Sequence, residues 1–239
     1  MKEELITRAA LMGVSLSENQ ADQLIRYSEL LREWNEKINL TAITEPGEIL
    51  SKHFLDCLSL IPYLRANFPQ NCTIIDVGTG AGFPGLVLKI AMPELKMVLL
   101  DSLQKRVRFL ETVCEELSLE DVVCIHARAE ELAHDENYRE HFDIATARAV
   151  SSLPALAEYC SGYVKSGGEF IAYKGPGWQE EMAENEAVFE KLRLFFEKSL
   201  PIELPGTDLR HELVFFRKKG KLSLQYPRSQ SKIKKVTKK

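Results

Sequence analysis

The sequence predicts an α/β protein with a doubly wound, mostly parallel sheet and a helical extension at its N-terminus. After residue 72, short apolar runs alternate with stretches of helical periodicity, which is the pattern of consecutive βαβ units. The first of these runs lies in TIIDVGTGAGFPG, residues 73–85, where three glycines follow at alternate positions. Before it, residues 1–66 carry apolar side chains at helical spacing.

The first 66 residues are expected to form the helical extension. Ser17 and Gln20 have the spacing of a capping box at a helix start, and Pro46 suits the first turn of a later helix. Large apolar side chains recur at helical spacing between them, and we expect these to pack in the core: Leu24, Tyr27, Leu31, Trp34 and Ile38.

Two polar features interrupt this helical region. Asn39 opens the loop NLTAI, and His53 lies three residues before Asp56, so that both side chains share one helix face. An aspartate can hold a histidine in position for acid–base chemistry. A structural, partly buried pair explains the same spacing, and from the sequence it is the preferred interpretation.

The stretch 73–85 predicts a nucleotide-binding corner. Its first five residues are short, β-branched and bounded by glycine, which is typical of a buried parallel strand. Gly78, Gly80 and Gly82 allow a sharp turn with φ > 0 and let a ligand lie against bare backbone. The helix that follows begins with free N–H groups, and the corner lies at the carboxyl end of its strand, where such sheets bind ligands.

The acid before these glycines bears on which nucleotide is bound. The window from Gly80 to Gly85 satisfies G-x-G-x-x-G, which is a weak signal alone. Asp76, two residues before Gly78, would repel the pyrophosphate of a dinucleotide. It would suit the cationic amino group and sulfonium of S-adenosylmethionine (AdoMet), whose product after methyl transfer is S-adenosylhomocysteine. Capping of the turn or helix by Asp76 is the alternative interpretation.

Further apolar runs predict the rest of the sheet, at residues 97–101, 122–125, 142–147, 168–173 and, as a terminal strand, 212–216. Helices are expected between them. One lies near residues 153–163, and one long helix fills about 178–198.

Polar residues follow several of these strands, at the edge where parallel strands place their carboxyl ends. Asp101 lies 21 residues after Gly80, where a carboxylate accepts hydrogen bonds from ribose hydroxyls; capping of the next helix is a serious alternative. The loop after the third strand can present backbone amides and one side chain to an adenine edge. Arg148 follows the fourth strand, where it can hold a carboxylate or phosphate, and Lys174 ends the fifth.

The charge distribution and the cysteines limit the kinds of partner and compartment that fit this sequence. The net charge of −4 conceals a split, because residues 217–239 hold ten basic and no acidic residues, leaving 21 basic and 35 acidic, or −14, before them. A basic tail on an acidic body favours an anionic partner such as nucleic acid; a solvated tail is the alternative. Five cysteines without C-x-x-C predict neither a zinc cluster nor a disulfide framework, which fits a reducing, cytoplasmic compartment. No apolar run is long enough to span a membrane.

Several motifs taken together resemble the glucose-inhibited division protein B family. They are DVGTGAGFPG, LLDSLQKRVRFL, the RAE at residues 128–130, FDIATARAV and YKG, while NLTAI and KHFLDCLSL match that family's N-terminal extension. The resemblance implies a seven-stranded, class I (Rossmann-like) AdoMet-dependent methyltransferase. It implies three parts, a helical extension (1–66), the methyltransferase domain (67–219) and a basic tail (220–239).

The resemblance also implies an activity and a set of contacts. The family methylates N7 of a guanine, at target position 527, in the decoding-region loop of 16S ribosomal RNA, so the RNA or the small ribosomal subunit is the expected partner of a monomeric enzyme. The cofactor contacts implied are Gly78, Phe83, Ala129, Glu130 and Arg148.

Methyl transfer to guanine N7 asks little acid–base chemistry of a protein. N7 is unprotonated near neutral pH and carries an in-plane lone pair, so orientation supplies most of the rate. No residue is therefore assigned a certain catalytic role and no metal is expected. The candidate substrate-side groups are Arg148, Lys174, His53 and Asn39.

Three other functions remain as alternatives. A small-molecule methyltransferase would have no reason for a basic tail. A dinucleotide-dependent dehydrogenase is disfavoured by Asp76. A non-catalytic RNA-binding assembly factor with a relic AdoMet fold is disfavoured by intact cofactor motifs, and a titration with AdoMet would separate it from an enzyme.

Overall fold

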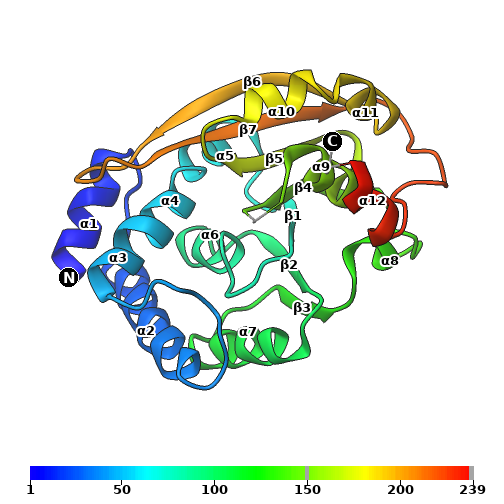
Figure 1. Cartoon of the computed structure of the whole chain (residues 1–239). Helices are drawn as coiled ribbons and strands as arrows, with labels where there is room; N and C mark the ends of the chain where they lie inside the picture. Colours follow the sequence, from blue (N-terminus) through cyan, green and yellow to red (C-terminus); the bar gives the residue numbers. More distant parts are fainter. Residues whose placement is uncertain (149–150, 237–239) are drawn as a thin grey trace.

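The chain folds around one central sheet in a computed structural model that describes residues 1–148 and 151–236. The last two residues of the FDIATARAV motif and the last three of the basic tail lie outside the described residues. Figure 1 shows the sheet between two layers of helices, with the N-terminal helices at one side. Across the described residues, no helix has the length and apolar composition needed to cross a membrane.

The sheet has seven strands in the order β3-β2-β1-β4-β5-β7-β6. Strands β1 to β5 pair in parallel, while β7 is antiparallel to both of its neighbours. The expected class I methyltransferase sheet is thus confirmed. The strands are β1 (Thr73–Val77), β2 (Lys96–Asp101), β3 (Val122–His126), β4 (Phe142–Ala147), β5 (Val164–Lys174), β6 (Leu194–Glu203) and β7 (Arg210–Lys218).

Helices account for most of the rest of the described chain. The capping box predicted at Ser17 is confirmed, because its side chain accepts from the backbone of Gln20 while the Gln20 side chain accepts in return. Before the sheet come α1 (Lys2–Leu11), α2 (Glu18–Asn35), α3 (Pro46–Ile49), the π-helix η1 (Leu50–Phe54), α4 (Leu55–Leu58) and α5 (Ile61–Asn67). The later helices are α6 (Gly85–Ala91), α7 (Gln104–Glu116), α8 (Ala129–Leu132), α9 (Leu153–Ser161), α10 (Trp178–Ala183), α11 (Glu186–Lys191) and α12 (Gln230–Val236).

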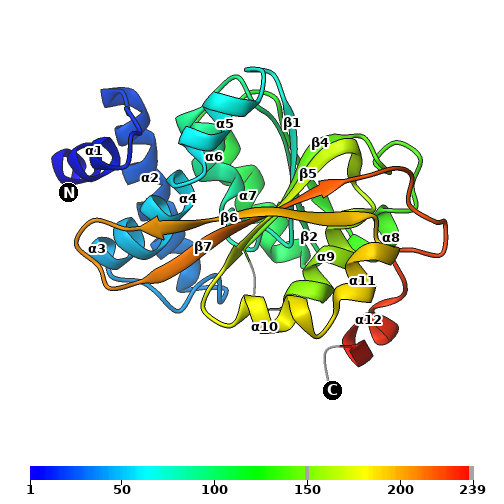
Figure 2. The same cartoon turned by 90° about the horizontal axis from the view of Figure 1, so that it is seen from above.

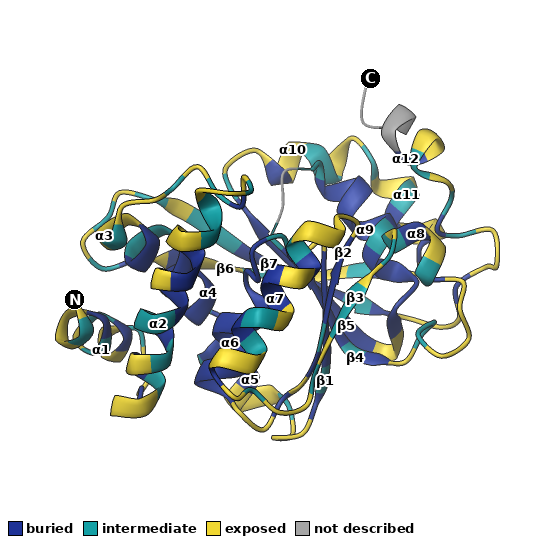
Figure 3. Ribbon diagram, turned by 90° about the horizontal axis from the view of Figure 1, so that it is seen from below, coloured by how far each residue is buried: buried dark blue, intermediate teal, exposed yellow. Residues whose placement is uncertain are grey.

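The two faces of the sheet build two hydrophobic cores, because side chains alternate along each strand. Ile74 of β1 packs with the N-terminal helices, α6 and α7, whereas Ile75 packs with α9 and the chain after β7. In Figure 3 the strands are buried between helices whose outer faces are exposed. The N-terminal helices therefore extend the core of one face of the sheet.

The long helix predicted over 178–198 is wrong. The chain instead forms α10 and α11, and Arg193 then takes a positive φ of 60° that ends the helical path. From Leu194 the chain pairs with β7 as the edge strand β6 (Figure 2). Apolar residues at helical spacing near Met182 and Phe189 are present, but the aromatic pair at 195–196 belongs to a strand.

Candidate functional site

The glycine turn after β1 uses its glycines for two different purposes. Gly78 and Gly80 have positive φ values of 71° and 61°, and a Cβ atom at Gly78 would meet nothing within 4 Å. At Gly82, with φ of 98°, a Cβ would collide with Leu86 and lie 2.8 Å from the hydroxyl oxygen of Tyr27. The first two glycines thus leave open space at the turn, whereas Gly82 lets protein side chains pack.

Asp76, at the end of β1, accepts hydrogen bonds from both ends of the glycine turn. It is fully buried, and its Oδ2 accepts hydrogen bonds from the Thr79 hydroxyl at 2.6 Å and from the Gly85 N–H at 2.8 Å. Burial raises its pKa to about 6. Its Oδ1 is buried and has no hydrogen-bond partner among the described residues. The capping interpretation therefore accounts for one carboxylate oxygen and leaves the other available.

Asp101 ties the end of β2 to the same turn. Its Oδ2 accepts from the Gly80 N–H at 2.9 Å, and its Oδ1 accepts from the Leu103 N–H at 2.9 Å. The N-cap of α7 is Leu103, so Asp101 holds the turn just before the helix rather than capping it directly. Arg106 donates to Oδ2 from 3.4 Å. Because a carboxylate oxygen can accept more than one hydrogen bond, Asp101 can still accept hydrogen bonds from ribose hydroxyls.

A pocket of about 260 Å³ opens at the carboxyl ends of β1 to β3. Gly78, Asp101, Ala129 and Glu130 line it, so the structure brings together four of the nine residues predicted for the cofactor. Its walls come from the ends of β1 and β2, the loop after β3, the start of α8, α7, the segment before α9, α9 and the C-terminal helix: Val77, Gly78, Leu100, Asp101, Ser102, Arg106, Ala127, Arg128, Ala129, Glu130, Ser151, Leu156, Tyr159 and Gln230.

The other five predicted cofactor residues lie outside this lining. Asp76 and Gly80 lie at the glycine turn, within the hydrogen bonds just described. Gly82 faces Tyr27 and Leu86. Arg148 belongs to a polar cluster beside the turn, and the Phe83 ring packs against that cluster.

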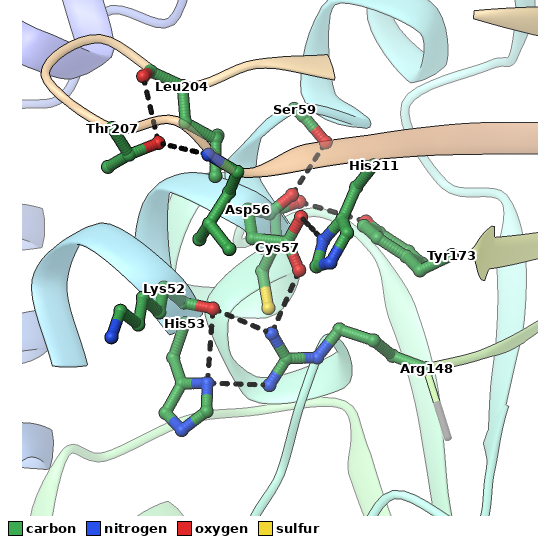
Figure 4. A network of polar contacts seen from close by, with 11 residues as sticks. Lys52, His53, Asp56, Cys57, Ser59, Arg148, Tyr173, Leu204, Thr207 and His211 are labelled. Atoms are coloured by element: carbon green, nitrogen blue, oxygen red, sulfur yellow. Dashed lines mark hydrogen bonds and ion pairs between the residues drawn. The ribbon is translucent and has the colours of Figure 1, made fainter. Parts of the chain in front are cut away.

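This Arg148 cluster, comprising Arg148, His53, Asp56 and His211, joins the N-terminal helices to the sheet (Figure 4). Arg148 donates through Nη1 to Asp56 Oδ2 at 2.9 Å and through Nη2 to His53 Nδ1 at 2.9 Å. His211 Nδ1 donates to Asp56 Oδ1 at 3.0 Å. Asp56 is fully buried, the guanidinium compensates its charge, and His211 satisfies its second carboxylate oxygen with a hydrogen bond.

His53 is neutral in this cluster. Burial, followed by the charge of Arg148, lowers its pKa to about 4. Nδ1 accepts from the guanidinium, so the ring proton lies on Nε2, 3.0 Å from the Thr41 hydroxyl. The expected pairing of His53 with Asp56 is not formed. Arg148 lies between them, and the histidine that Asp56 holds is His211, which the sequence interpretation missed.

Phe83 connects the glycine turn to the cluster. Its ring centroid lies 4.4 Å from that of His53, and the Arg148 guanidinium lies 4.9 Å from the same Phe83 centroid. The Phe83 ring of the glycine turn is therefore in contact with both His53 and Arg148.

The two remaining substrate-side candidates lie apart from the cluster. Lys174, 9% exposed, donates to both carboxylate oxygens of Glu181, at 2.9 and 3.1 Å. Asn39 is exposed in its loop. The side chain that holds this loop is Asn35, whose Oδ1 accepts from the N–H groups of Leu40 and Thr41. Asn35 was not singled out from the sequence, because it continues the helical run before the loop.

Two solved structures with a similar fold are described as methyltransferases. A predicted O-methyltransferase from Agrobacterium tumefaciens matches with a TM-score of 0.54 and 20% identity, over 71% of this chain and 82% of that one. A SAM-dependent methyltransferase from Aquifex aeolicus matches with a TM-score of 0.51 and 16% identity, over 77% and 97%. At these identities the likeness concerns the fold, and the fold is that of a class I methyltransferase.

Sequence comparison is more specific. The family described as GidB, rRNA small subunit methyltransferase G, matches residues 20–202. Ribosomal RNA small subunit methyltransferase G of Acetivibrio thermocellus is 45% identical over 97% of this chain and 94% of the relative. The protein of the same name from Alkaliphilus metalliredigens is 48% identical over 91% and 90%. The chain belongs to the GidB family of small-subunit rRNA methyltransferases, as the motifs predicted.

Proposed function

We propose that the protein transfers the methyl group of AdoMet to N7 of a guanine in the decoding-region loop of 16S ribosomal RNA, in the cytoplasm where the small subunit is assembled. The observation that carries the proposal is the pocket that Gly78, Asp101 and Glu130 line in a chain of this family. The guanine and its N7 atom rest on the family resemblance.

The residues around the pocket fit AdoMet. Gly78 supplies a turn with positive φ and open space where a side chain would stand, which suits a ligand lying on the backbone. Asp101 supplies a carboxylate at the end of β2 for ribose hydroxyls. Glu130 and the backbone near Ala129 supply polar groups for the adenine edge. Asp76, with its unpartnered Oδ1 just behind the turn, supplies negative charge toward a cationic group.

AdoMet supplies an electrophilic methyl group on a positively charged sulfur. Guanine N7 needs no base to become nucleophilic. The role left to the protein is therefore to hold N7 in line with the methyl group of AdoMet and to keep water away from the reacting atoms. Neutral His53 and the guanidinium of Arg148 are proposed as the substrate-side groups, since they lie beside Phe83 of the glycine turn. Lys174 and Asn39 remain candidates without a contact to this cluster.

Exposed basic residues near the C-terminus support an RNA substrate. Lys219, Lys221 and Lys232 are exposed, and phosphate contacts of this kind position RNA without reading its sequence. Other basic residues counted from residue 217 onward form ion pairs within the protein. Lys218 pairs with Glu140, and Arg228 pairs with the buried Glu158. Fewer basic side chains are therefore free to contact RNA than the ten counted in residues 217–239.

The test is a transfer assay with AdoMet labelled in the methyl group. The protein is incubated with small-subunit particles from cells lacking the enzyme and, separately, with the small-molecule fraction of the same cells. Label in 16S RNA is expected. Label confined to the small-molecule fraction would replace RNA by a small substrate, and AdoMet binding without transfer to either would indicate an assembly factor.

A further inference from the structure

The C-terminal segment, residues 221–236, is attached to the protein and reaches the pocket. Leu222 and Ile233 are buried, and α12 packs on α9. In Figures 1 and 2 the helix lies at the end of the molecule where α8 and α9 lie. Gln230, the first residue of α12, lines the same pocket as Gly78 and Asp101.

Two side chains from the methyltransferase domain hold this segment through its backbone. Arg139 donates to the carbonyl oxygens of Tyr226 at 3.0 Å and of Leu222 at 3.2 Å. The ring of His134 lies 2.9 Å from the Pro227 carbonyl oxygen. These bonds span more than eighty residues of sequence, so the path of the segment is specified by the folded domain.

A buried ion pair fixes the segment just before Gln230. Glu158 of α9 is 1% exposed. Its Oε1 accepts from the backbone N–H and the Nε of Arg228, each at 2.8 Å, and its Oε2 accepts from Nη2 at 2.6 Å. A bidentate pair of this kind has defined geometry. The backbone position of Gln230, two residues later at the edge of the pocket, is therefore fixed by this ion pair.

Gln230 also contacts the loop assigned to adenine. Its Oε1 accepts from Arg128 Nη1 at 3.3 Å, and Arg128 comes directly before Ala129 and Glu130. Tyr159 of α9 lines the same pocket. The carboxamide is thus a polar group among the residues that surround the adenosine end, and an amide side chain has both a donor and an acceptor for an adenine edge.

We propose that the C-terminal segment forms the outer wall of the cofactor pocket and that Gln230 binds the adenosine portion of the cofactor. The proposal rests on AdoMet being the cofactor. It makes the segment part of the cofactor site as well as a carrier of exposed lysines, so occupancy of the pocket and the position of the basic segment become linked.

The test is titration calorimetry with S-adenosylhomocysteine on the full chain. Gln230→Met keeps the length of the side chain and removes its hydrogen-bonding groups, and Gln225→Met makes the same change at an exposed position of the same segment. Removal of one hydrogen bond raises Kd by up to about tenfold. Gln230→Met is expected to show this increase with an unchanged urea midpoint, while Gln225→Met keeps the wild-type Kd.

A second readout follows the segment itself. Binding of S-adenosylhomocysteine is expected to slow hydrogen exchange of backbone amides in residues 229–236 of the wild-type protein, and to slow it less in Gln230→Met. A wild-type Kd for Gln230→Met, or exchange in this segment that ignores the ligand, would overturn the inference while leaving the proposed cofactor intact. Failure of the wild-type protein to bind would overturn both.

Discussion

Alanine at Gly78 and alanine at Gly82 are expected to damage two different properties of the protein. Both glycines have positive φ, at 71° and 98°, so either alanine costs about 1–2 kcal/mol of backbone strain. The surroundings then differ. A Cβ at Gly78 enters open space beside the pocket, whereas a Cβ at Gly82 collides with Leu86 and approaches the Tyr27 hydroxyl.

Overpacking adds about 1–3 kcal/mol at Gly82. Gly82→Ala should therefore lower the free energy of unfolding by about 2–5 kcal/mol, and Gly78→Ala by about 1–2 kcal/mol. Gly78→Ala, in contrast, places a methyl group on the surface that receives the cofactor. A misfit of about 1.4 kcal/mol raises Kd about tenfold, which is the smallest increase expected.

Urea unfolding and calorimetry with S-adenosylhomocysteine, run on both variants, separate these effects. The expected result is a weakly destabilised Gly78→Ala that binds poorly, and a strongly destabilised Gly82→Ala whose folded fraction binds better than Gly78→Ala. Equal unfolding free energies for the two variants, or wild-type affinity for Gly78→Ala, would refute the division of roles within the motif.

Three further predictions concern charge. The pKa of His53 is about 4 in the folded protein and 6.5 in the unfolded chain. Between about pH 4 and pH 6.5 the unfolded chain therefore binds more protons than the folded protein. The free energy of unfolding is expected to rise with pH across this window, by about 3 kcal/mol. His53→Gln should remove this rise, measured as the difference between the two pH profiles of urea unfolding; parallel profiles would contradict it. Arg148→Met leaves the buried Asp56 carboxylate without its guanidinium and should lower the unfolding free energy by about 3–5 kcal/mol, and a decrease below about 1 kcal/mol would show the pair to be dispensable. Replacing Lys221 and Lys232 together by Gln should weaken RNA binding, because both side chains are exposed. The slope of log K against log salt concentration should become shallower by about 0.7 for each RNA phosphate that the variant no longer neutralises, while the affinity for S-adenosylhomocysteine stays unchanged. An unchanged slope would show that these lysines do not contact RNA.

The parallel strands could be predicted because a strand buried on both faces is a continuous apolar run. β1 and β4 are mostly apolar and nearly all buried, and their predicted bounds, 73–77 and 142–147, agree with the structure. β6 lies at the edge of the sheet, where its sequence LFFEKSLPIE includes charges, so neither a continuous run nor a clean alternation marks it. The helical spacing of apolar residues in α10 and α11 was therefore continued into the first residues of β6, and the helix was predicted to end at residue 198.

The candidate site divides in the same way. Gly78 and Asp101 were predictable because topology places strand ends together whatever the rest of the chain does. His211 and Gln230 were missed because their partners, Asp56 and Arg128, are distant in sequence and no local pattern records such a contact. The basic tail was inferred from charge alone, which cannot indicate that Arg228 faces a buried glutamate.

The proposed activity of the protein is the methylation of one guanine of 16S RNA at N7. The most direct measurement treats small-subunit particles, taken from cells lacking the enzyme, with this protein and labelled AdoMet, and then maps N7-methylguanine by borohydride–aniline strand scission. One stoichiometric cleavage in the decoding-region loop is the predicted result. Incorporation of label without scission would contradict the N7 assignment, and no incorporation despite measured AdoMet binding would contradict the proposed substrate.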